Sequence, residues 1–135
     1  MKRNALIALS LCVALLAAAI PVLAHHAIAA EFDTTKPIKF EGTVKTVDWM
    51  NPHIYVNIET KEAGKTVVYS VEGGPPNSLY RQGWRPDSLK IGDKVTANGV
   101  RAKKAESNRI GNAQITMPDG RVFARGAANN SAAQQ

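Results

Sequence analysis

"IKFEGTVKTVDW", residues 38–49, indicates one long β-strand whose alternation breaks once. Apolar or small residues occupy every second position and then resume one position out of phase. The first set is Ile38, Phe40, Gly42 and Val44, and the second set is Val47 and Trp49. Because the side chains of a strand point alternately to its two faces, one extra residue near Lys45 or Thr46 must be absorbed. A β-bulge absorbs such a residue and bends the strand, so we predict a long first strand with a bend.

Four further stretches indicate strands on both sides of a central interruption. They are "HIYVNIET" (53–60), "TVVYSVE" (66–72), "SLKIGDKVTANGVRA" (88–102) and "RIGNAQITM" (109–117). The first two are joined by "KEAG", whose glycine suits a short hairpin, and the last is followed by the turn "PDG". We predict a short extension of the sheet at "RVFA" and a polar loop at "KKAESN".

The interruption between the third and fourth strands has the pattern of a short helix. In "GGPPNSLYRQGW", residues 73–84, the breakers are followed by Asn77 or Ser78 as the predicted N-cap. Gly83 is the predicted stop, because glycine adopts the left-handed conformation that ends many helices. The helix is therefore about two turns long.

Five strands, a bent first strand and one helix between strands three and four predict an all-β protein with a five-stranded OB-like β-barrel. In that barrel the bent first strand pairs in both halves, and closure leaves no exposed edges. A small β-sandwich is the alternative, although it usually has more strands and no helix at this place.

The beginning of the chain has the pattern of a secretory signal peptide. Lys2 and Arg3 precede a long apolar run, and Val22 and Ala24 lie where signal peptidase requires small residues. We therefore expect cleavage after Ala24, a periplasmic or secreted protein, and no stable membrane insertion after cleavage. The expected organisation is a signal peptide over 1–24, one barrel domain over 25–125 and a disordered tail, small and polar, over 126–135.

Charge and cysteine content exclude several classes of function for the processed chain. The one cysteine, Cys12, lies inside the apolar run, so the mature domain has no disulfide, no thiolate metal site and no cysteine nucleophile. Loss of Lys2 and Arg3 lowers the formal net charge from +6 to +4. This mild positive charge is too small to predict nucleic-acid binding.

Several phrases recur in one order and resemble a known family. The phrases are "AHHAIAAEFD", "VDWMNPHIYVNI", "GGPPNSLYRQGWRPDSLKIGD" and "ITMPDG". Together they resemble a family of small exported bacterial proteins catalogued as a domain of unknown function. The resemblance implies an exported β-rich domain and brings no activity with it.

The three histidines, His25, His26 and His53, are candidate metal ligands. Cleavage after Ala24 would give His25 a free α-amine beside its imidazole, and both groups lose their protons near neutral pH. A third nitrogen from His26 or His53 would complete a set that suits Cu(II). The alternative is that the adjacent histidines form a polar terminus and that His53 only begins a strand.

A second group of residues is the candidate ligand face. Its members are Trp49, Asn51, Glu72, Asn77, Arg81 and Trp84. Trp49, Asn51 and His53 could line the mouth of a pocket, whereas in the structural alternative Asn51 caps a turn at Pro52 and Trp49 closes one end of the barrel.

Glu72 has both a structural and a catalytic interpretation. In the structural one it accepts from the first amides of the helix or pairs with Arg81, while Trp84 covers the end of the barrel below the helix. In the catalytic one it acts as a general base near His53, which requires a proximity that spacing cannot show. We assign no catalytic residue, since no nucleophile elbow or phosphate loop occurs.

The sequence thus predicts a binding or accessory protein rather than an enzyme. The sharpest hypothesis is copper capture by the processed terminus, through His25 with His26 or His53. The alternative is a metal-free module that binds a small ligand or a periplasmic protein through the Trp49–His53 face and a basic loop. The cations of that loop are Arg101, Lys103, Lys104 and Arg109.

Overall fold

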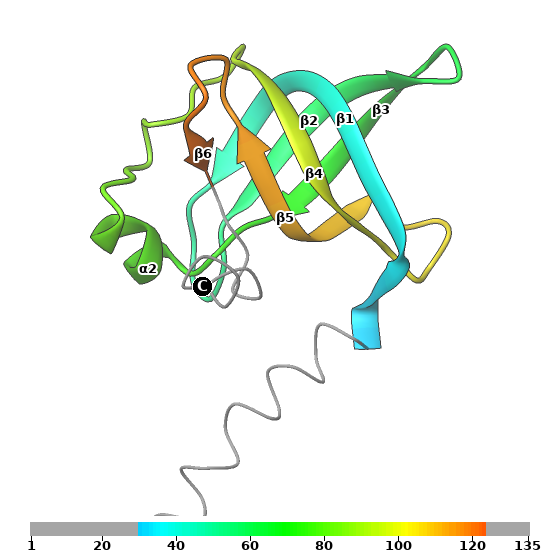
Figure 1. Ribbon diagram of the computed structural model, residues 1–135, viewed down its shortest axis with the longest axis horizontal. Coiled ribbons are helices and arrows are strands. Elements are labelled where there is room, and N and C mark those ends of the chain that lie inside the picture. The colour runs from blue at the N-terminus through cyan, green and yellow to red at the C-terminus, as the bar shows by residue number, and fades with distance from the viewer. Residues whose placement is uncertain (1–29, 124–135) are drawn as a thin grey trace, which may run out of the picture. The chain divides into compact units, whose positions relative to one another are not determined.

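The computed structural model describes residues 30–123, which form an all-β barrel with one short helix (Figure 1). The elements are β1 (Phe32–Asp48), β2 (Tyr55–Glu62), β3 (Lys65–Glu72), α2 (Pro76–Arg81), β4 (Lys94–Ala102), β5 (Arg109–Thr116) and β6 (Val122–Phe123). The predicted strands, the helix between the third and fourth strands, and the short extension after the turn are therefore all present. The predicted signal peptide and the predicted tail lie outside the described residues.

A ring of strand pairings closes the barrel. The long β1 pairs antiparallel with both β2 and β4, and β5 pairs antiparallel with β4. Parallel pairing of β3 with β5, at Ser70 with Arg109 and Val71 with Ile110, closes the ring. The predicted OB-like order is confirmed, and β6 adds a sixth, two-residue strand beside β5.

The bend of β1 has the predicted cause. Its register with β2 shifts between Val44 and Thr46, so that one residue more lies on β1 than on its partner. Val44 is fully buried, and after the bulge Val47 packs against the core again. The bulge therefore allows one strand to turn its apolar side chains inward in both halves of the barrel.

Helix α2 begins two residues earlier than a helix capped by Asn77, the first of the two predicted caps. Its N-cap is Pro75 and makes no side-chain hydrogen bond, so neither Asn77 nor Ser78 caps the helix. Consecutive prolines favour this start because Pro76 has a fixed φ and the first helical position needs no donor. The predicted stop is confirmed: Gly83 has φ +87°, its N–H donates to Tyr80, and the next N–H donates to Leu79, as in a Schellman motif.

Large side chains close the barrel at the end near α2, which we call the helix end. Phe123 is fully buried, and the rings of Trp84 and Trp49 lie 4.7 and 6.2 Å from it. Trp49 also meets Tyr80 of α2 edge to face, at 5.4 Å. Both predicted roles, Trp49 closing an end and Trp84 covering it, agree with these contacts.

Candidate functional site

Three strands place a small polar cluster at one edge of the barrel. His53 lies two residues before β2, Glu72 ends β3, and Arg109 begins β5. Two backbone hydrogen bonds join the first two segments: Ile54 N–H donates to the Gly74 carbonyl (3.3 Å), and Gly73 N–H donates to the Ile54 carbonyl (2.9 Å). The parallel register of β3 with β5 then brings Arg109 beside them.

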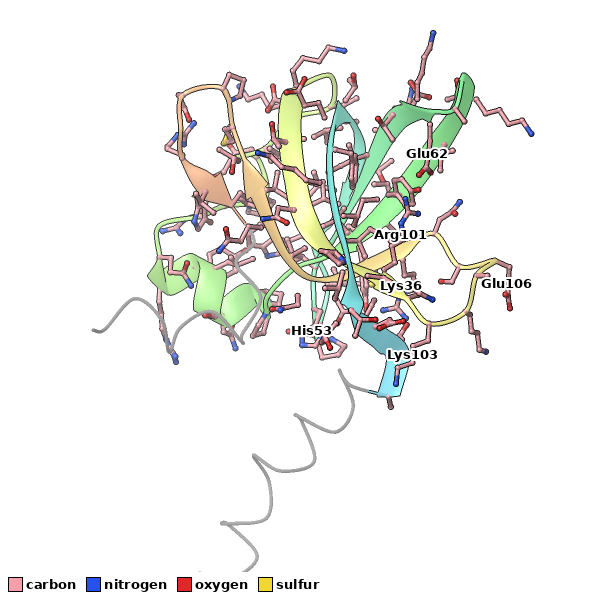
Figure 2. All side chains as sticks on the ribbon, turned by 45° about the vertical axis from the view of Figure 1, so that its right-hand side comes forward. Lys36, His53, Glu62, Arg101, Lys103 and Glu106 are labelled. Atoms are coloured by element: carbon pink, nitrogen blue, oxygen red, sulfur yellow. The ribbon has the colours of Figure 1, made fainter. Side chains whose placement is uncertain are left out.

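Glu72 is the centre of this cluster, which we call the His53 cluster. Its Oε1 lies 2.6 Å from His53 Nδ1, and its Oε2 accepts from Arg109 Nη2 at 2.7 Å. The side chain of Glu72 is only 15% exposed, whereas that of His53 is 42% exposed. A half-buried carboxylate thus holds an accessible imidazole, which Figure 2 shows at the margin of the barrel.

Aromatic rings hold Arg109 in place. Its guanidinium carbon lies 5.5 Å from the ring centre of Tyr55 and 5.7 Å from that of Phe32. The Tyr55 hydroxyl also lies 3.5 Å from Nη2. Because Phe32 is the first residue of β1, the start of the described barrel belongs to the same cluster.

The contact with Glu72 determines which nitrogen of His53 can react. A carboxylate paired with an arginine only accepts hydrogen bonds, so Nδ1 carries the hydrogen and donates it. In a neutral imidazole the lone pair then lies on Nε2. This arrangement, a carboxylate behind a histidine, orients many metal-binding histidines and can equally serve proton transfer.

Metal donors are few in the part of the chain that the structure describes. Within residues 30–123, no three His, Cys, Asp or Glu side chains gather into a group that could hold a metal ion. His25 and His26 lie outside those residues. A metal at His53 would therefore need donors from beyond the described barrel.

The sequence matches the model of a protein family over residues 13–113, and the family is described as "Family of unknown function (DUF6152)". The match covers most of the chain. The chain belongs to this family. No curated protein and no solved structure matches it.

The candidate ligand face divides between two parts of this DUF6152 member. Glu72 belongs to the His53 cluster, whereas Trp49 and Trp84 belong to the aromatic packing of the helix end. Asn51, Asn77 and Arg81 are exposed. The hydrogen bonds of Glu72 go to His53 and Arg109, in place of the predicted helix amides or Arg81.

The sequence did not single out Tyr55, and it grouped Arg109 with the cations around the loop between the last two strands. Arg109 begins β5 and Arg101 lies within β4, as the predicted strands over 109–117 and 88–102 require. Strand alternation can identify the face on which each residue lies, but not which strands will be neighbours across the ring. A further polar contact that was missed joins Glu62 of β2, Tyr69 of β3 and Arg101 of β4.

Among the described residues, no helix has the length and apolar character needed to cross a membrane.

Proposed function

We propose that the chain is an exported binding protein that captures Cu(II) with its processed terminus and His53. The observation that carries the proposal is the hydrogen bond between Glu72 and His53 Nδ1, at 2.6 Å, on a histidine that is 42% exposed. It leaves Nε2 as an accessible, oriented nitrogen ligand. The α-amine and imidazole of His25, and the imidazole of His26, would supply the other nitrogens.

Chain length is compatible with this ligand set. Phe32, whose ring contacts the Arg109 guanidinium, is seven residues after His25. An extended segment spans at most about 3.5 Å per residue, so the terminus can reach about 25 Å from Phe32. A nitrogen-rich set of this kind suits Cu(II), which forms the strongest complexes of the first-row divalent ions.

The proposal is tested by Cu(II) titration with electron paramagnetic resonance on protein exported and cleaved by its own signal. The same protein with one extra residue before His25 has no α-amine at that position, and we expect it to lose the nitrogen hyperfine pattern. A His53→Gln variant should bind more weakly, and Glu72→Gln should lower the affinity about tenfold because it disturbs the orientation of the ligand. Equal, weak binding by all four proteins would refute copper capture.

A second candidate function is a metal-free module that binds a small ligand or a periplasmic protein. It is supported by exposed apolar side chains beside Trp49: Met50 is 51% exposed and Tyr80 is 41% exposed. Apolar side chains that gather on a surface often mark an interaction site. Two results would favour this module. A purified partner would bind equally well after removal of copper, and it would fail to bind a Met50→Ser variant.

A further inference from the structure

The barrel has a gap where the first half of β1 and the tip of the β2–β3 hairpin part from one another. β1 pairs with β4 from Pro37 to Thr43, but it pairs with β2 only from Thr43 onward. The β2–β3 hairpin remains paired to its tip, so its outer half leaves β1, as Figure 1 shows at the upper right. A gap in the pairing therefore exposes part of the barrel interior.

A hollow of about 360 Å³ occupies this gap, and we call it the open mouth. Ile38 and Phe40, both partly buried, line it with apolar surface, and the buried ring of Tyr69 lies 4.9 Å behind that of Phe40. Ile38 and Phe40 share the inward face of β1 with the buried Val44. The volume is at the lower end of the range for small-ligand sites.

The polar side of the open mouth is strongly biased toward positive charge. Lys39, Lys61 and Arg101 line it together with a single acid, Glu62. A hollow with apolar rings and excess cations suits an anion that carries an apolar body. By contrast, the larger hollow of about 460 Å³ beside Lys94 has no aromatic side chain among its described lining residues.

Arg101 already holds a carboxylate inside this mouth. Its Nη2 donates to Glu62 Oε1 at 2.5 Å, and its Nη1 donates to the Tyr69 hydroxyl at 2.7 Å. The guanidinium carbon also lies 5.3 Å from the centre of the Tyr69 ring. Figure 2 shows Glu62 on the hairpin and Arg101 below it.

Glu62 is well placed to move away. It is the last residue of β2, its side chain is 48% exposed, and the turn at Ala63 and Gly64 follows it. A carboxylate at the end of a hairpin can leave without disturbing the core. Its exit would free one donor of Arg101, Nη2, and the Tyr69 hydroxyl, which donates to Glu62 Oε2.

We infer that the open mouth binds a small aromatic carboxylate, whose acid group replaces Glu62 on Arg101 while its ring lies against Ile38 and Phe40. Glu62 then acts as an internal competitor for the ligand. The inference is independent of copper capture, since it uses none of the residues of the His53 cluster. It predicts that removal of the Glu62 charge tightens binding, a gain that a damaged fold could not produce.

The test is a calorimetric titration of the exported protein with 2-naphthoate, with the neutral 2-naphthamide as a second probe. We expect 2-naphthamide to bind the native protein at least about tenfold more weakly than 2-naphthoate does. Arg101→Gln should bind 2-naphthoate more weakly by at least the same factor, since each change removes a charged hydrogen bond. Glu62→Gln should bind naphthoate about threefold or more tightly. Arg121→Gln is the matched control, because Arg121 also pairs with an acid, Asp119, and lies over a ring, Trp84.

A parallel NMR titration locates the probe through the chemical shifts of the backbone amide nitrogens and protons. Shifts centred on Phe40, Tyr69 and Arg101 support the inference. Absence of naphthoate binding, equal affinity for the two probes, or shifts centred elsewhere would overturn it. A Glu62→Gln variant that binds no more tightly than the native protein would refute the role of Glu62 as competitor and with it the inference.

Discussion

At the scale of single residues, Glu72 connects more of the molecule than its place at a strand end suggests. It joins the segment before β2 to the start of β5 through His53 and Arg109. Neither partner is close to it in sequence: the β2–β3 hairpin brings His53 beside it, and the pairing of β3 with β5 brings Arg109. A half-buried acid with two partners is costly to neutralise, because both partners lose a charged acceptor at once.

Glu72→Gln is therefore expected to destabilise the barrel by about 1–3 kcal/mol, because the amide leaves Arg109 without a charged acceptor in a partly buried place. The free energy of unfolding in urea measures the effect. Glu59→Gln is the control: its side chain pairs with Lys45 at 3.5 Å on the surface, and exposed pairs contribute less than about 1 kcal/mol. Equal losses in the two variants would contradict the importance of the His53 cluster for the fold.

Glu62 allows a prediction about pH. Hydrogen bonds from Tyr69, and then from Arg101, hold the pKa of the Glu62 carboxyl below its ordinary value. A group with a lowered pKa in the folded state stabilises the protein above its ordinary pKa, and this contribution is lost as pH falls through the folded value. We expect the unfolding free energy of Glu62→Gln to fall less steeply below about pH 4.3 than that of the native protein. If the unfolding free energies of the two proteins fell equally steeply below this pH, the interaction would not persist in solution.

At the scale of elements, the end of α2 depends on one backbone conformation. Gly83 has φ +87°, and the space beside its Cα is open, so an added Cβ would meet no neighbour. Gly83→Ala should therefore cost about 1 kcal/mol through backbone strain alone. Thermal unfolding measures this cost, and Gln82→Ala, one residue earlier at the C-cap, is the control. If Gly83→Ala were as stable as the native protein, the C-terminus of α2 would relax freely.

The strands and the helix together show which local features the sequence can predict and which it cannot. The bulge near Lys45, the hairpin at Gly64 and the stop at Gly83 could be predicted because each depends on the local alternation or on glycine. The start of α2 was predicted wrongly, because two prolines began the helix where a side-chain cap was expected. The place of Arg109 in the His53 cluster could not be predicted, since it depends on parallel pairing of β3 with β5.

At the scale of the whole molecule, the helix end and the open mouth of the barrel are built differently. The helix end is closed by Trp49, Trp84 and Phe123, whereas the open mouth is lined by aromatic rings and charges. The closed helix end provides the rigidity that a binding site in the open mouth would require. The short β6 contributes to this closure more than its two residues suggest, because it carries Phe123.

Phe123→Ala should therefore destabilise the entire barrel by about 3–5 kcal/mol, the cost of removing a fully buried aromatic ring. Both tryptophans of the chain lie beside this ring, so their fluorescence should report the change directly. Val122→Ala is the matched control, because Val122 precedes Phe123 on β6 and is 41% exposed. We expect that variant to lose less than about 1 kcal/mol. If the two variants were equally stable, the helix end would not hold the barrel together. The barrel would then be closed by the pairing of β3 with β5 alone.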